Sequence, residues 1–162
     1  MAEISLSELK KRYSLLEKKY KLPTFSQMND VFDIDHVAER DVEFLLREMR
    51  RYINDKIMNY LRFIEMLLNP ASAGAPMFLF SLTKLLSPEK RSELEKTYAL
   101  LARMNLNSLS LDIASKEKNE AEFILNVYKN WKDIITSLQN VMKDFQDNWD
   151  QEAKRSNKSY FG

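Results

Sequence analysis

Residues 121–149 read AEFILNVYKNWKDIITSLQNVMKDFQDNW and carry an unbroken heptad of apolar residues. The apolar positions are separated alternately by three and four residues, so they lie along one side of a single long helix. These positions are Ala121, Ile124, Tyr128, Trp131, Ile135, Leu138, Met142, Phe145 and Trp149. A helix that is apolar along one side must bury that side against a neighbouring segment or another molecule.

The composition of the heptad favours burial within the chain over a coiled-coil dimer. A two-stranded coiled coil prefers aliphatic residues in its seam and charged residues beside it. This seam contains several aromatic residues, and the positions beside it are mostly apolar, as at Val127, Ile134 and Val141. An apolar face of three positions per heptad is typical of a helix inside a globular bundle. We therefore expect the heptad to lie in the core of the fold.

The scarcity of glycine and proline predicts long helices joined by few loops. The 162 residues include 2 glycines and 4 prolines, whereas strands and hairpins need glycine-rich turns. A helix over residues 121–149 is about 43 Å long, and a compact chain of this length is roughly 40 Å across. We predict an all-α fold, an elongated bundle of about five helices, two long and three shorter, with no sheet. Residues 1–153 are predicted to form a single domain, followed by a flexible tail at residues 154–162.

Capping patterns locate the starts of three helices. Ser5, with Glu8 three residues later, predicts a first helix that runs to about residue 21. Thr24 and Gln27 predict a short second helix in the same way. The order serine, proline, glutamate at residues 87–89 predicts the start of another helix, because proline suits the first helical position and an acid suits the first turn.

Two further boundaries are predicted from breaks in periodicity. A long third helix is expected to begin near Asp33 and Asp35 and to end at Asn69-Pro70, with Val42 among the residues of its apolar stripe. Apolar residues alternate at Leu109, Leu111 and Ile113, which favours an extended connection before the final helix.

The first helix has a narrow apolar stripe flanked by charged residues. Leu9, Tyr13 and Leu16 lie on this stripe, and we regard them as candidates for binding a partner helix. The alternative is that the first helix docks within the chain. We favour docking, because acidic residues that could pair with its lysines and arginines follow at Asp35, Glu39, Asp41, Glu43 and Glu48.

Met77, Phe78 and Phe80 form the second candidate for partner binding. They follow a loop of small residues, and methionine and phenylalanine are adaptable or large anchors at protein interfaces. The alternative is a short buried helix that covers one end of the bundle.

The sequence offers little for catalysis. His36 is the single histidine, and its neighbours Asp33 and Asp35 suit capping of a helix N-terminus. The chain has no cysteine, no Glu-x-x-His pair of the di-iron type and too few glycines for a phosphate-binding loop. We predict that the protein is not an enzyme and uses no cofactor and no metal.

A basic face and a basic C-terminal segment suggest the alternative of nucleic-acid binding. The candidate residues are Arg47, Arg50, Arg51, Lys154, Arg155 and Lys158. The overall balance of 25 basic and 24 acidic residues counts against this class, since nucleic-acid binders usually carry a clear basic excess. Acidic residues also interleave with the arginines, as on an ordinary solvated helix.

Localisation is predicted from the cysteine content, from one uncharged stretch and from the first residues of the chain. Residues 66–83 are uncharged, but Asn69, Pro70 and Gly74 interrupt them, so we expect no membrane span. The first residues lack an apolar core of signal-peptide length, and the absence of cysteine excludes disulfides. We predict a cytoplasmic, non-catalytic helical adaptor or scaffold that binds a protein partner, with a second copy of the chain as one candidate. The alternative is an RNA- or ribosome-associated protein.

Overall fold

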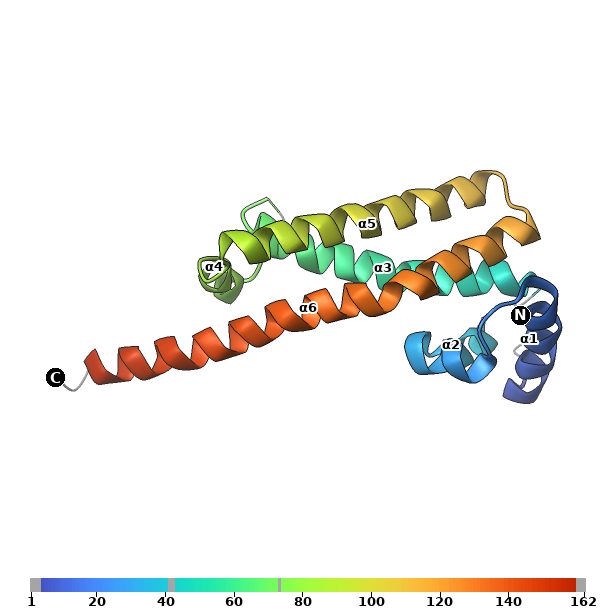
Figure 1. Cartoon of the computed structure of the whole chain (residues 1–162), viewed down its shortest axis with the longest axis horizontal. Coiled ribbons are helices and arrows are strands. Elements are labelled where there is room, and N and C mark those ends of the chain that lie inside the picture. The colour runs from blue at the N-terminus through green and yellow to red at the C-terminus, as the bar shows by residue number, and fades with distance from the viewer. Residues whose placement is uncertain (1–3, 41–42, 73, 160–162) are drawn as a thin grey trace. The chain divides into compact units, whose positions relative to one another are not determined.

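The computed structural model describes residues 4–40, 43–72 and 74–159, with the backbone alone for residues 150–159. These residues form six α-helices and one 3-10 helix and include no strand, which confirms the predicted all-α class (Figure 1). The predicted count of about five helices is slightly low. In chain order the elements are α1 (Leu6–Tyr20), α2 (Phe25–Phe32), η1 (Ile34–Glu39), α3 (Leu45–Leu68), α4 (Met77–Thr83), α5 (Pro88–Ile113) and α6 (Glu117–Ser159).

The chain divides into two compact units. The first unit is Met1–Asn59 with Ala102–Trp131, and the second is Tyr60–Leu101 with Lys132–Gly162. The boundaries fall inside α3, α5 and α6, so the single domain predicted for residues 1–153 remains a prediction. The backbone of α6 stays helical to Ser159, beyond the predicted end of the domain, and the mobility of residues 154–162 also remains a prediction.

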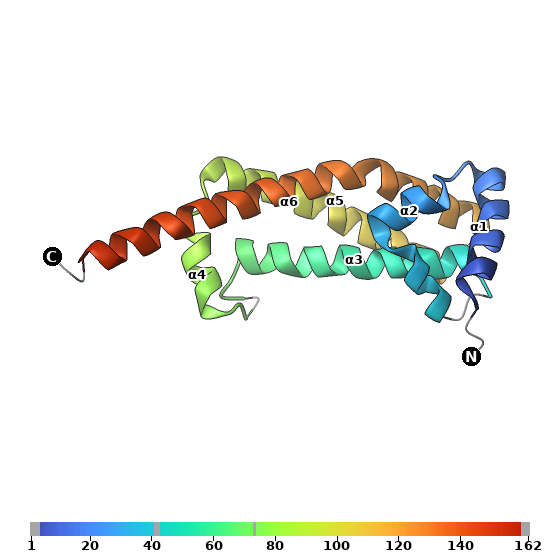
Figure 2. The same ribbon diagram turned by 90° about the horizontal axis from the view of Figure 1, so that it is seen from below.

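In the first unit, α1, α2 and η1 pack against one another (Figure 2). The predicted caps form, since the Ser5 hydroxyl accepts from the Glu8 N–H at 3.2 Å and Thr24 makes a reciprocal capping box with Gln27. Aromatic rings fill the core behind these helices. The Phe32 ring centroid lies 5.0 Å from that of Trp131 on α6.

The heptad of α6 is buried over most of its length. In the first unit Ile124 and Trp131 are buried, and in the second unit Leu138 and Phe145 are buried. Met142 and Trp149 differ, with 37% and 45% of their surface exposed. Burial of the heptad is therefore confirmed for its first part, whereas its last part is partly open to solvent.

The predicted third helix is two elements. Asp33 ends α2 in the left-handed region, at φ 54°, and η1 follows before α3 begins at Leu45. The left-handed residue turns the chain, which a continuous helix does not allow. Val42 lies outside the described residues.

The extended connection predicted after Leu109 is wrong, because α5 remains helical through Ile113. Apolar residues four apart lie on the same side of a helix as well as on the same face of a strand. The alternating pattern therefore did not distinguish the two.

Thr24→Ala is expected to lower the free energy of unfolding by about 1 kcal/mol, because the alanine leaves the Gln27 N–H without its cap. Urea denaturation followed by circular dichroism measures this change. Ser26→Ala, at an exposed position in the first turn of α2, is the control and should change stability by less than about 0.5 kcal/mol. Equal losses in the two variants would contradict the capping interpretation.

Candidate functional site

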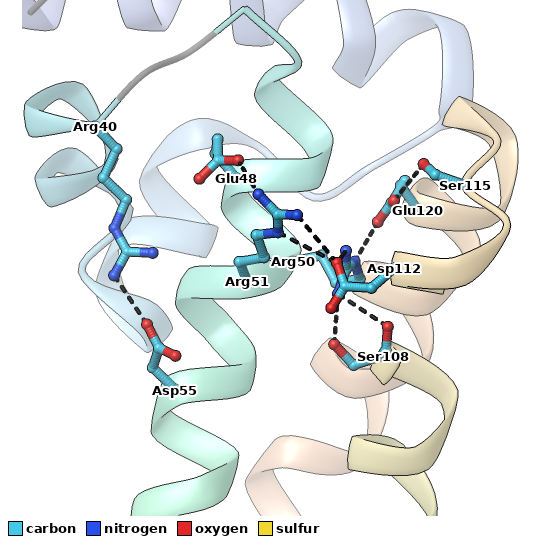
Figure 3. Close-up of polar contacts among 9 residues, drawn as sticks. All are labelled: Arg40, Glu48, Arg50, Arg51, Asp55, Ser108, Asp112, Ser115 and Glu120. Atoms are coloured by element: carbon cyan, nitrogen blue, oxygen red, sulfur yellow. Dashed lines mark hydrogen bonds and ion pairs between the residues drawn. The ribbon is translucent and has the colours of Figure 1, made fainter. Parts of the chain in front are cut away.

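Arg50 on α3 is the centre of a buried polar cluster in the first unit (Figure 3). Its Nε donates to Glu120 Oε2 on α6 at 2.6 Å, and its Nη2 donates to Asp112 Oδ1 on α5 at 2.6 Å. Its Nη1 donates to the carbonyl and the hydroxyl of Ser108, at 3.0 and 2.7 Å. The cluster therefore joins α3, α5 and α6 through one guanidinium group.

Both carboxylates of the cluster accept hydrogen bonds from neighbouring side chains. Glu120 is 1% exposed, and its other oxygen accepts from the Ser115 hydroxyl at 2.7 Å. The hydrogen bond from Arg50 holds the pKa of Asp112 below its usual value, helped by the charge of Arg50 and by Arg51. Because each group is engaged by another within the cluster, this arrangement resembles a structural connection more than a reactive centre.

The structure shows how accessible the three arginines of α3 that were predicted to bind nucleic acid are. Arg50 has 0% exposure, so its guanidinium cannot reach a phosphate in this structure. Arg51 is half exposed and bridges Asp112 and Glu48, at 3.2 and 3.0 Å. Arg47 lies over the Phe44 ring, 4.8 Å from its centroid. Arg50 therefore does not belong to the basic face that the spacing suggested, whereas a basic face at Arg47 and Arg51 remains a prediction.

The charge of Arg40 is also paired with an acid, since its Nη2 lies 2.9 Å from Asp55 Oδ2 (Figure 3). Lys154, Arg155 and Lys158 lie on the last turns of α6, and their side chains are outside the described part of the structure.

The predicted partner seam on α1 is largely closed. Leu9 is 1% exposed and Tyr13 is fully buried, with its hydroxyl donating to the Pro23 carbonyl at 2.6 Å. Burial raises the pKa of Tyr13, with a smaller contribution from Glu17. Leu9 and Tyr13 are therefore core residues and cannot contact a partner in this conformation, while Leu16 is half-buried.

Docking of α1 within the chain includes an acid outside the predicted set. Lys19 Nζ donates to Glu117 on α6 at 2.6 Å, and the Tyr20 hydroxyl donates to the same carboxylate at 2.5 Å. These two contacts also lower the pKa of Glu117. Glu117 begins a helix 97 residues after Tyr20, so no local charge pattern could indicate the pairing.

The predicted Met77–Phe80 segment is largely exposed in the second unit. Met77 is 85% exposed, Phe78 54% and Phe80 36%, whereas Leu79 is buried and anchors α4. The alternative of a fully buried helix is therefore wrong for these three side chains. Exposed aromatic and methionine side chains at this density are characteristic of contact surfaces.

A groove joins this segment to the end of the α6 heptad. It has a volume of about 470 Å³ and is lined by Phe78 and Leu82 of α4 and by Met142, Phe145 and Trp149 of α6, with Gln146 and Asp147 at its polar edge. A second groove, about 390 Å³, lies between Tyr60 and Phe63 of α3 and the preceding turns of α6, and shares Met142 and Gln146 with the first. We call Phe78, Met142 and Trp149, which line this groove and are exposed, the α4–α6 surface.

The sequence interpretation missed the contribution of α6 to this surface, although a signal was present. The position beside the seam is apolar at Val127, Ile134 and Val141 but becomes Asn148 in the last heptad. An apolar face that narrows in this way indicates that the helix is leaving the core.

A second exposed apolar stripe was also missed, on α5 in the first unit. Leu106, Leu109 and Ile113 are 63%, 49% and 89% exposed and follow a 3-4 spacing. The predicted extended connection at these residues concealed the stripe.

Other classes of site find no support in the described part of the chain. Its His, Cys, Asp and Glu side chains include no group of three or more placed to hold a metal ion. None of its helices is both long enough and apolar enough to cross a membrane. Comparisons with models of protein families, with curated proteins and with solved structures found no match.

Arg50→Met is expected to lower the free energy of unfolding by about 3–5 kcal/mol, because it leaves Glu120 buried without a counter-charge. Arg51→Met is the matched control. Arg51 is half exposed and contacts the same Asp112, so its replacement should cost less than about 1 kcal/mol. Chemical denaturation of the two variants measures the difference. Similar costs at the two positions would show that burial of Arg50 does not set its contribution.

Acid is expected to weaken the cluster through Asp112. Its folded-state pKa is lowered, so its stabilising contribution is complete above the ordinary aspartate pKa of about 4 and is lost as the pH falls through the folded value. Denaturant titrations between pH 7 and pH 3 should show a steeper fall below about pH 4 for the wild type than for Asp112→Asn. Parallel curves for the two proteins would contradict this assignment.

Proposed function

We propose that this protein is a non-catalytic protein-interaction module that binds a protein partner through the α4–α6 surface. The observation that carries the proposal is the exposure of large apolar side chains around one groove. Phe78, Met142 and Trp149 line this groove and are each more than a third exposed. Scattered apolar residues are normal on protein surfaces, but a patch that gathers around a concave site favours a binding function.

The side chains of the surface suit this role energetically. Tryptophan, methionine and phenylalanine are enriched at interface centres, where a few anchors in pockets contribute most of the binding energy. Gln146 and Asp147 at the edge of the groove supply the polar rim that such interfaces carry.

A non-catalytic role is supported by how the reactive groups are placed. His36 is exposed and its Nδ1 lies 3.3 Å from Glu39 Oε1. The polar groups of the Arg50 cluster are engaged with one another. We place the module in the cytoplasm, as the absence of cysteine favours.

RNA or ribosome binding remains the alternative, with weaker support. The arginines proposed for it on α3 are buried, paired with acids or stacked on a ring, which leaves the C-terminal residues Lys154, Arg155 and Lys158 to carry the interaction. Phosphate binding by so few cations would be weak and strongly salt-dependent.

Replacing Phe78, Met142 and Trp149 together by serine is expected to abolish capture of the protein partner from source lysate. The triple variant should keep the helical content of the wild type by circular dichroism, because all three side chains are at least a third exposed. Capture should resist nuclease and high salt. Leu15→Ser, at a position 68% exposed on α1, is the control and should leave capture intact.

Three outcomes would count against this proposal. Equal capture by the triple variant would remove the α4–α6 surface from the binding site. Loss of capture after nuclease treatment, or a steep decrease with salt, would favour the RNA alternative.

A further inference from the structure

The last turns of α6 lack a neighbour within their own unit. In both views α6 runs on past α4, and no other described helix of the second unit lies beside its end (Figures 1 and 2). The backbone nevertheless stays helical to Ser159. Helical segments of a few turns without tertiary packing are marginal in water, so this end of α6 is expected to be covered by something.

We propose that the partner of the α4–α6 surface is the same surface of a second copy of this chain, with the two α6 helices antiparallel about a two-fold axis near residue 145. The inference rests on the proposed function and names its partner. It is carried by the charge pattern along the exposed side of α6.

Lys143 and Asp147 provide this pattern. They are four residues apart, so they lie on the same flank of α6, and both are exposed beside Met142 and Gln146. Within the described part of the chain neither takes part in an ion pair. A lone positive and a lone negative charge on one flank make a surface complementary to itself when the copy runs in the opposite direction.

The register follows from helix geometry. A two-fold axis perpendicular to α6 brings a flank against the same flank of the copy, with a residue before the axis opposite the residue equally far after it. An axis at residue 145 therefore sets Lys143 opposite Asp147 of the second copy, and this pair forms twice.

The apolar residues of α6 agree with this register. The same axis places Met142 about 1.5 Å, one residue rise, from the level of Trp149 of the second copy. Sulfur–aromatic contact between methionine and tryptophan is favourable. The charged flank and the apolar seam thus place the axis at the same point, and Gln146 lies next to it.

Charge reversal tests the pairing in solution. Lys143→Glu and Asp147→Lys should each weaken the dimer by roughly tenfold, because each sets like charges opposite one another in both pairs. An equimolar mixture of the two variants should regain wild-type dimerisation, since the heterodimer restores opposite charges in both pairs. Sedimentation equilibrium measures the dimer dissociation constant of the wild type, of each variant and of the mixture. A mixture that dimerises no better than the two variants do separately would overturn the proposal.

Cysteine cross-linking tests the direction in a chain that contains no cysteine of its own. In the antiparallel register, residue 146 and its copy are separated by about 3 Å along the helix axis. Gln146→Cys should therefore form a disulfide-linked dimer on mild oxidation. Gln139→Cys is the matched control, one heptad earlier on the same face of α6. Its copy lies about 18 Å further along, beyond the reach of a disulfide. Cross-linking of Gln139→Cys without Gln146→Cys would overturn the antiparallel arrangement.

Two outcomes separate this inference from the proposed function. A strict monomer at all concentrations, together with capture of another protein that the Phe78, Met142 and Trp149 substitutions abolish, would overturn the dimer and leave the module. A dimer that survives those substitutions but is lost on replacing Leu106 and Ile113 by glutamine would place self-association on the α5 stripe, which also overturns the inference.

Discussion

A guanidinium group removed from water needs its charge and its N–H groups matched where it lies, and in the first unit Arg50 imposes that requirement. Its partners are Glu120 on α6 and Ser108 and Asp112 on α5, at hydrogen-bonding distances of 2.6–3.0 Å. Apolar side chains alone allow helices to slide or rotate at modest cost. A directional network of this kind does not, so it fixes the register of three helices. Buried ion pairs contribute little net stability but are well suited to such specificity.

The side of α5 that faces away from the network carries exposed apolar residues. Ser108 and Asp112 are one turn apart and both face Arg50. With this side of α5 committed to the cluster, Leu106, Leu109 and Ile113 are turned toward solvent. The exposure of the stripe therefore accompanies the orientation of α5 that places Ser108 and Asp112 against Arg50.

The sequence was sufficient for features that depend on local chemistry. Helix class, the caps at Ser5 and Thr24 and the buried part of the α6 heptad all follow from periodicity and from side chains within four residues of the backbone groups they satisfy. Features that depend on pairing between distant segments were not accessible. Arg50 looked like one of several surface arginines, because its partners lie 58 to 70 residues away. The candidate site divides in the same way, since Met77, Phe78 and Phe80 were identified but their neighbours on α6 were not.

The heptad is closed in the first unit and partly open at its end in the second, and the difference lies in the residues that flank it. From Ala121 to Trp131 the seam is closed by residues such as Phe32, whose ring packs on Trp131. Beyond Phe145 the flanking position turns from valine to asparagine, and the seam residue Trp149 remains 45% exposed. A tryptophan on a helix that stays regular for another ten residues is costly to leave in water, and a partner that covers it gains the most from the contact. Lys143 and Asp147 border the same stretch with opposite charges. In the proposed dimer, a second α6 in the reverse direction therefore covers the exposed seam residues and pairs these charges at the same time.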